Sequence, residues 1–335
     1  MSAPVVSFFN NKGGVGKTTL VYHVGWMAAE LGYRVLAVDL DPQANLTAVS
    51  LEESAIERLW ANERQTIYGA VSPLLDGLGD LRDVDPQRID RNLSLLPGDL
   101  KLAAAEQEFG QQWSNALDRN ARAFRVVSAP ARAIRAAAET VDADVVVVDV
   151  GPSLGAINRL AMVASDYVVV PMSPDLYSIQ GLRNLGPTIR QWGQEWVDRR
   201  QRAEVSDLWL PEGSMTPVGY VVLQHGVRTS RVVQAYDRWI RRIPGEYRSS
   251  VLDVPPGDHE VPSAADDVNC LGLVKHYHSL VPMAQEARKP MFNLKSADGA
   301  IGAHQAAVSA SHAFFRDLVM TIMDRVGVVT DPGRH

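Results

Sequence analysis

The sequence predicts a doubly wound α/β fold, a mostly parallel sheet flanked by helices, and three observations support it. Apolar runs such as Val145–Val148 lack internal alternation, which indicates strands that are buried on both faces. These runs alternate along the chain with stretches of helical periodicity, as in a parallel sheet with crossover helices. A glycine-rich loop, Lys12–Thr19, lies between the first apolar run and the first helical stretch. In such folds a ligand sits beyond the carboxyl ends of the strands.

The expected elements follow one another in a regular order. Strands are expected at Val5–Phe9, Arg34–Asp39, Asn92–Leu96, Asp144–Asp149, Tyr167–Pro171, Pro217–Leu223 and Leu271–Lys275. Helices are expected at Thr18–Leu31, Ala121–Thr140, Ile157–Ala164, Ile179–Asp198, Arg231–Arg242 and Ala300–Val326. The remaining long segments are expected to be insertions into a single domain that spans residues 1–335, near Leu51–Arg91, Glu195–Gly213 and Pro244–Asn269.

Composition narrows the class of protein. With 46% hydrophobic residues, a chain of 335 residues can bury one large core or two small ones. Cys270 is the only cysteine, which argues against a disulfide framework and a thiolate metal cluster. The longest apolar runs are strand-length, and no secretory signal precedes the first strand, so we expect a cytoplasmic protein. The net charge of −6 argues against bulk attraction to nucleic acid, so any DNA contact needs a local patch.

The glycine-rich loop predicts a phosphate-binding site. Its glycines permit a tight turn that points backbone N–H groups at an anion, and the helix that follows adds its positive N-terminal dipole. Lys17 can reach the β- and γ-phosphates, and the Thr18 hydroxyl can bind Mg²⁺. We therefore expect a nucleoside triphosphate to be bound by the residues Gly13, Gly14, Val15, Gly16, Lys17, Thr18 and Thr19.

Carboxylates follow two of the expected strands. Asp39 and Asp41 come at the end of the second strand with a spacing that lets both face the phosphates, and Pro42 stiffens the turn after them. Asp149 follows the apolar run Val145–Val148, a pattern typical of a Walker B aspartate that holds Mg²⁺ through its water shell. Asp149 is therefore expected at a magnesium site.

The loop departs from the general G-x-x-x-x-G-K-[ST] pattern in an informative way. Asn11 replaces the first glycine, and a second lysine, Lys12, opens the loop. This resembles the deviant Walker A box of the ParA/MinD ATPases. The resemblance implies that Lys12 reaches the phosphates of ATP held by a partner subunit, so that ATP joins a homodimer. The alternative is a solvated loop lysine.

Further segments resemble the same family. Asp39–Asn45 is similar to the D-x-D-P-Q-x-N box, which implies that Asp41 positions or activates the attacking water and that Asp39 supports the Mg²⁺ shell. Gly151 stands where the family usually has proline, which puts the timing of the nucleotide switch in doubt. Asp175 matches an acidic dimer-interface position, although a helix N-cap is an equal alternative. Gln224 is placed to read the adenine edge.

The C-terminal part carries weaker signals. The turn Glu286–Pro290 is similar to the family's E-A-x-x-x-G-K-P turn, shortened and without its glycine. Phe314–Val326 is amphipathic but carries two Asp beside two Arg, so a packed helix is expected rather than a membrane-binding one.

An arginine-rich segment is the candidate DNA contact. Arg228 and Thr229 match an R-T position that implies a DNA contact in the family. Six arginines against two acidic residues lie between positions 228 and 248. Sequence-blind, salt-dependent binding of DNA phosphates would follow, with a solvated charged face as the alternative. The candidate DNA-binding residues are Arg228, Arg231, Arg238 and Arg242, of which the last three fall on one helical face.

The resemblance implies a slow, Mg²⁺-dependent ATPase that forms a homodimer in the ATP state. Its expected role is partitioning or positioning of DNA or another cargo, with a ParB-like or other activator protein and, if DNA is bound, association with the nucleoid. Two alternatives remain. One is a nucleotide switch of the same fold that regulates a partner protein complex without binding DNA. The other is a small-molecule ligase or synthetase on this fold.

Overall fold

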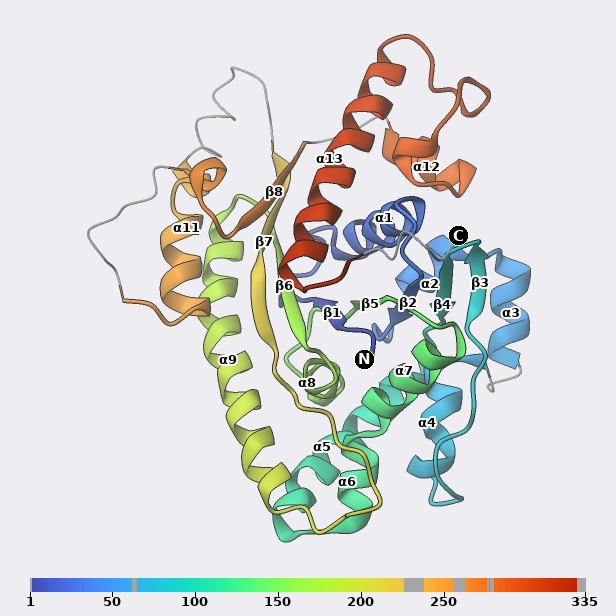
Figure 1. Cartoon of the computed structure of the whole chain (residues 1–335), viewed down its shortest axis with the longest axis vertical. Coiled ribbons are helices and arrows are strands. Elements are labelled where there is room, and N and C mark those ends of the chain that lie inside the picture. Colours follow the sequence, from blue (N-terminus) through green and yellow to red (C-terminus); the bar gives the residue numbers. More distant parts are fainter. Residues whose placement is uncertain are drawn as a thin grey trace.

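The computed structural model describes residues 2–61, 65–225, 238–255, 263–275, 277 and 280–329. Within these residues one sheet of eight strands has the order β3-β4-β2-β5-β1-β6-β7-β8 (Figure 1). Strand β3 is antiparallel to β4, and the other neighbouring pairs are parallel, which confirms the predicted fold class. The strands are β1 Val5–Phe8, β2 Val35–Asp39, β3 Gln87–Asp90, β4 Leu93–Leu96, β5 Val145–Asp149, β6 Tyr167–Met172, β7 Thr216–His225 and β8 Cys270–Lys275.

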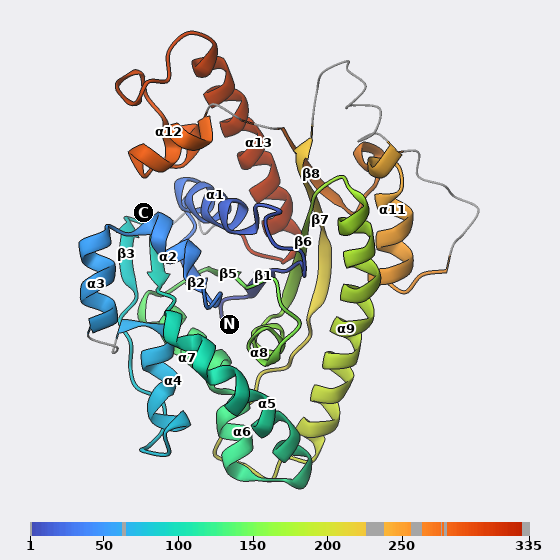
Figure 2. The same ribbon diagram turned by 180° about the vertical axis from the view of Figure 1, so that it is seen from behind.

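Helices cover both faces of the sheet (Figures 1 and 2). One face carries α1 Lys17–Glu30, α12 Leu280–Ala287 and α13 Ala303–Arg325. The other carries α4 Ile67–Leu75, α5 Ala105–Asn115, α6 Ala121–Val127, α7 Ala129–Thr140, α8 Ala156–Val163 and α9 Leu176–Gln201. The short α11 Ile243–Glu246 packs on α9, and the β3–β4 edge is flanked by α2 Asn45–Ser50 and α3 Glu53–Ala61.

The central strand β5 shows why its sequence lacks alternation. Val146 and Val148 pack into the core beneath α4 to α9, whereas Val145 and Val147 pack into the core beneath α1 and α13. All four side chains are completely buried. Burial of a valine contributes about 1.5–3 kcal/mol relative to an exposed one, so both faces of this strand stabilise the fold.

Several elements differ from the sequence-based expectation, among them α2, α5 and α12, which lie outside the expected helices. The stretch Ala121–Thr140 forms two helices that meet at Ser128, because Pro130 has no N–H to continue the hydrogen-bond ladder. Strand β3 was not expected, since Ile89 is its only large apolar residue and the strand lies at the antiparallel edge of the sheet. Of the expected helix Arg231–Arg242, residues 231–237 lie outside the described part of the chain, and residues 238–240 are helical.

The three segments expected to be insertions contain several short elements. Leu51–Arg91 holds α3, α4 and β3, Glu195–Gly213 holds the end of α9 and the loop after it, and Pro244–Asn269 holds most of α11. Residues 62–64 and 256–262 of these segments lie outside the described part.

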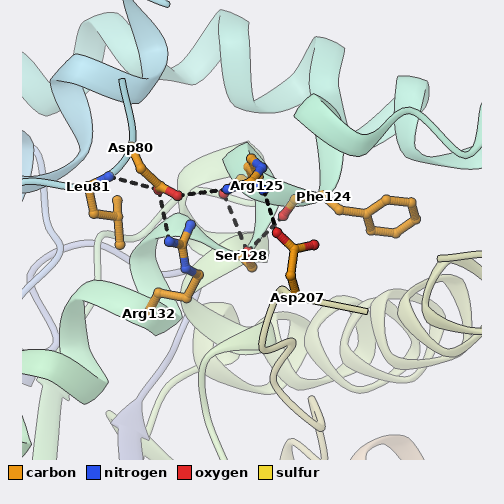
Figure 3. A network of polar contacts seen from close by, with 7 residues as sticks. All are labelled: Asp80, Leu81, Phe124, Arg125, Ser128, Arg132 and Asp207. Atoms are coloured by element: carbon orange, nitrogen blue, oxygen red, sulfur yellow. Dashed lines mark hydrogen bonds and ion pairs between the residues drawn. The ribbon is translucent and has the colours of Figure 1, made fainter. Parts of the chain in front are cut away.

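A polar network joins the loop after α4 to two helices and to the loop after α9 (Figure 3). Asp80 pairs with Arg132 at 2.8 Å and with Arg125 at 2.9 Å, and Arg125 also pairs with Asp207 at 3.0 Å. Burial raises the pKa of Asp80, but the Leu81 N–H and the two arginines outweigh it and leave that pKa below its usual value. The network fixes parts of two expected insertions onto the same side of the sheet.

The amphipathic helix near the end of the chain packs onto the sheet, as expected. Helix α13 buries Phe315, Leu318, Val319 and Ile322 against the core that also contains α1. Among the helices in the described ranges, none combines the length and the hydropathy needed to cross a bilayer.

Candidate nucleotide-binding and hydrolysis site

The phosphate loop has the backbone conformation that its glycines permit. Gly14 (φ +72°) and Gly16 (φ +92°) are left-handed, and α1 begins directly afterwards at Lys17. Asn10, which the sequence analysis did not single out, anchors the start of the loop. Its side chain donates to Pro171 O at 2.5 Å and accepts from the Lys12 N–H at 2.8 Å. The feature of the sequence that could have identified Asn10 is its position directly after the first expected strand.

Lys17 is the buried lysine of the site. Only 7% of the residue is exposed. Burial lowers the pKa of its ammonium, and the nearby carboxylates Asp149 and Asp41 oppose that shift. The ammonium therefore lies inside the loop among groups of opposite charge, where a phosphate of the chain's own nucleotide could replace part of that interaction.

Thr18 and Asp149 form a pair that fits a magnesium site. The Thr18 hydroxyl donates to Asp149 Oδ2 at 2.7 Å, and the buried Asp149 Oδ1 has no hydrogen-bond partner. Burial and the neighbouring Asp39 raise the pKa of Asp149. In the described residues no group of three or more His, Cys, Asp or Glu is arranged to hold a metal alone. This donor set suits Mg²⁺, which typically binds one or two protein oxygens together with phosphates and water.

Asp39 lies beside Asp149 but is bound by its own chain. The two residues are paired in register across β2 and β5. Asp39 Oδ2 accepts from the N–H and the hydroxyl of Thr47, at 2.8 and 2.7 Å, and Oδ1 accepts from the Asp41 N–H at 3.2 Å. Burial raises the pKa of Asp39, and the Thr47 hydrogen bonds oppose this. Its contacts thus fix α2 and the Asp41 turn, so any part in the Mg²⁺ shell is indirect in this arrangement.

Asp41 lies at the junction of two loops. Its Oδ1 accepts from the Gln43 N–H at 2.9 Å, which closes a turn around Pro42. Gly151 lies close by, since a Cβ added at Gly151 would come within 3.3 Å of Asp41 Oδ1. A side chain larger than hydrogen at position 151 would therefore meet the candidate hydrolytic carboxylate.

Lys12 lies at the rim of the site and pairs with Asp175. Asp175 also caps α9, because its Oδ1 accepts from the Ser178 N–H at 2.9 Å. The N-cap reading of Asp175 is therefore correct, and the same carboxylate holds Lys12 through its second oxygen. The exposed Tyr177 ring lies 5.9 Å from the Lys12 ammonium.

An apolar cavity adjoins the phosphate loop. Its volume is about 310 Å³, within the lower range of small-ligand sites. It is lined by Val15, Thr19, Leu223, Tyr277, Val281 and Pro282, among others. Gln224 belongs to β7, but its side chain lies outside the described part of the structure.

The candidate DNA-binding arginines are only partly described. Arg228 and Arg231 lie outside the described residues. Arg238 and Arg242 are exposed, and their guanidinium groups lie 4.5 and 5.0 Å from the centre of the Trp239 ring. These two cations are therefore gathered around one aromatic side chain.

Comparison with known proteins identifies the family. Residues 3–200 match a family model described as an AAA domain. The chain is 33% identical over 187 residues to the sporulation initiation inhibitor protein Soj of Bacillus subtilis, a match that covers 56% of this chain and 64% of Soj. It is also 33% identical over 187 residues to the chromosome partitioning protein ParA of Caulobacter vibrioides, which covers 56% of this chain and 62% of ParA. The matches thus span less than two thirds of these relatives.

Solved structures share the fold across almost the whole chain. A protein from Corynebacterium diphtheriae superposes with a TM-score of 0.72 at 24% identity, over 96% of this chain and 98% of that one. A Borrelia burgdorferi protein named for plasmid partition and bound to AMPPNP superposes with a TM-score of 0.58 at 17% identity, over 97% and 100%. These structures show the fold. The family match over residues 3–200, together with the similarity to Soj and ParA, shows that the chain belongs to the ParA/MinD type of P-loop ATPases.

Proposed function

We propose that this chain binds Mg²⁺-ATP, dimerises in the ATP state and hydrolyses ATP slowly. The contrast between its two loop lysines carries the proposal. Lys17 is buried among carboxylates inside the loop, whereas 27% of the Lys12 side chain is exposed at the rim. A lysine at the rim can exchange its ion pair with Asp175 for the phosphate of a nucleotide held by a second copy.

Each of the other side chains at the site has a separate role in this proposal. Lys17 and the loop N–H groups hold the phosphates. Thr18 and Asp149 would hold Mg²⁺, which neutralises charge on the β- and γ-phosphate oxygens when bound. Asp41 orients the attacking water, and Asp39 keeps the Asp41 turn in place through its hydrogen bonds to Thr47 and Asp41. The apolar cavity beside Val15 receives the base.

The names of the relatives support a proposal for the cellular role. We infer partitioning or positioning of DNA or another cargo, in concert with a ParB-like or other activator protein, because Soj and ParA are among the relatives. The exposed Arg238 and Arg242 supply phosphate-directed charge for sequence-blind DNA binding, to which Arg228 and Arg231 would add. A cytoplasmic protein that associates with the nucleoid would fit this role.

Light scattering with and without Mg²⁺-ATP tests the proposal, together with phosphate release. We expect the mass to double with ATP and to return to the monomer value as ATP is consumed. Asp41→Ala should bind ATP and remain dimeric, because the water is no longer oriented. An Asp41→Ala protein with wild-type turnover would contradict the role of Asp41, and a wild-type protein that stays monomeric with ATP would contradict the dimer.

Gel shifts on DNA of unrelated sequences separate the alternatives. Arg228→Glu and Arg242→Glu should each weaken ATP-dependent binding, and the remaining affinity should fall steeply with salt. Arg316→Glu on α13, next to Asp317, is the matched control. If no variant changes the affinity, a switch that acts through protein contacts is favoured. ATP hydrolysis without an organic acceptor would argue against a ligase.

A further inference from the structure

Glu106 of α5 caps a helix to which it does not belong. Its Oε1 accepts from the Ala156 N–H at 2.5 Å, and its Oε2 accepts from the Ile157 N–H at 3.0 Å. These groups form the first turn of α8, whose own N-cap residue, Gly155, has no side chain to satisfy them. A carboxylate is favourable at this position because it also faces the positive end of the helix dipole.

The capped turn ends the loop that follows the candidate magnesium ligand Asp149. We call residues 150–155 the switch loop. At its far end Gly155 packs so closely on Glu106 that a Cβ there would overlap Glu106 Oε1. Within the loop, Gly151 O and Ser153 O accept from the buried Asn158 side chain at 2.7 and 2.6 Å. The loop is thus held from α8 by Asn158 and from α5 by Glu106.

The near end of the switch loop contacts the residue assigned to hydrolysis. A Cβ at Gly151 would lie 3.3 Å from Asp41 Oδ1 and 3.7 Å from Pro42 Cδ. Because the position of a Cβ at Gly151 is this close to the Asp41 carboxylate, a shift of the loop toward Asp41 reduces the space available to that carboxylate. The switch loop therefore lies between Glu106, which holds the turn at its far end, and Asp41, which lies beside its near end.

We propose that Glu106 is a positioning residue for ATP hydrolysis, which holds the switch loop in the place that orients Asp41. This inference rests on the proposed function, in which Asp41 acts on water. Glu106 itself lies on α5 and approaches the site only through the loop. Its loss should therefore lower kcat and leave ATP binding intact, because its two hydrogen bonds hold α8 rather than the phosphate loop.

Glu106→Gln is the direct test. Glutamine keeps the size of the side chain but has one acceptor oxygen, so one of the two N–H groups loses its partner. We expect kcat to fall about tenfold with KM for ATP within about twofold of wild type. Amide hydrogen exchange in residues 150–157 should become faster. Glu108→Gln is the matched control, because Glu108 is on the same helix and pairs with Arg122 instead.

A double-mutant cycle asks whether Glu106 acts through Asp41. In the Asp41→Ala background, Glu106→Gln should cause no further loss of turnover. Gly155→Ala should also lower kcat, because its new methyl group would displace the Glu106 carboxylate. This variant replaces Glu106→Gln in the test if Glu106→Gln folds poorly. An unchanged kcat in Glu106→Gln, a parallel rise in KM, or an equal further loss in the Asp41→Ala background would overturn the inference. A wild-type protein without ATP turnover would instead overturn the proposed function.

Discussion

The Lys12 ammonium and the Asp175 carboxylate form an ion pair that joins the phosphate loop to the first turn of α9. In this pair Lys12, the lysine that the proposed dimer needs, is bound to a residue of its own chain. Asp175 at the same time accepts a hydrogen bond from the Ser178 N–H. Release of Lys12 therefore does not require α9 to lose its cap. The roles of Lys12 and Asp175 can therefore be tested by separate mutations.

Lys12→Ala should bind ATP with wild-type affinity and remain monomeric. The Lys12 backbone N–H bonds to Asn10 Oδ1 and is kept in the variant, so the loop conformation should persist. Light scattering measures the dimer, and a fluorescent ATP analogue measures binding. An ATP-dependent Lys12→Ala dimer would remove the role of this lysine across the interface.

Asp175→Asn should make the dimer form at a lower protein concentration. Asparagine caps a helix about as well as aspartate, so α9 should keep its N-terminus while Lys12 loses its charged partner. The pair is partly exposed, with 27% and 32% of the two side chains accessible, so we expect a tightening of about two- to fivefold. Weaker dimerisation would show instead that Asp175 itself contributes across the interface.

Gly151→Ala should lower turnover about fivefold or more and leave ATP binding unchanged, because the new methyl group would press on the Asp41 carboxylate. The measurement is steady-state phosphate release. Gly193→Ala on α9 is the control, since a Cβ there meets no atom within 4 Å. Equal turnover in both variants would mean that Gly151 does not limit the position of Asp41.

Asp149→Asn should weaken the Mg²⁺ dependence of nucleotide binding about tenfold or more. The amide removes the charge of the carboxylate and leaves one oxygen, which Thr18 already engages. Titration of Mg²⁺ into protein with a fluorescent ATP analogue measures this effect, and EDTA should abolish the Mg²⁺-dependent part in wild type. The exposed Asp118 gives a control in Asp118→Asn. A wild-type Mg²⁺ titration in Asp149→Asn would contradict the site.

Acidification should destabilise the protein through His23. Its Nδ1–H donates to Thr19 O at 2.6 Å, and its Nε2 accepts from the Met291 N–H at 3.0 Å, so the ring must be neutral. Burial lowers the pKa of His23 to about 4, against 6.5 for an ordinary histidine. The unfolded chain thus takes up the proton first, and stability falls as the pH drops from about 6.5 toward 4, by about 2 kcal/mol at pH 5.

Urea unfolding at pH 7.5 and pH 5.0 checks the contribution of His23. His23→Gln cannot titrate in this range, and it should lose less stability between the two conditions than wild type. Equal losses would place the pH dependence in other groups.

Much of the fold could be predicted because its signals are local. The apolar runs that became β1, β2, β5 and β6 are buried on both faces, so their pattern shows no alternation. The phosphate loop was equally predictable, since glycine adopts a left-handed backbone most readily, as at Gly14 and Gly16. Edge strand β3 was missed because little of it is buried.

The sequence by itself determined the class of the protein, the triphosphate loop and the residues Lys12, Lys17, Thr18 and Asp149 as candidates. Each of these is specified by neighbours a few positions away. Only the tertiary structure decided that Asp39 holds Thr47, that Lys12 is paired with Asp175, and that Glu106 caps α8. The Lys12–Asp175 and Glu106–α8 contacts join segments that are distant in the chain, because the order of the parallel strands and the packing of α5 on α8 bring them together. The sequence pattern does not show which helix packs on which. The contacts that support the site could therefore be identified only in the folded structure.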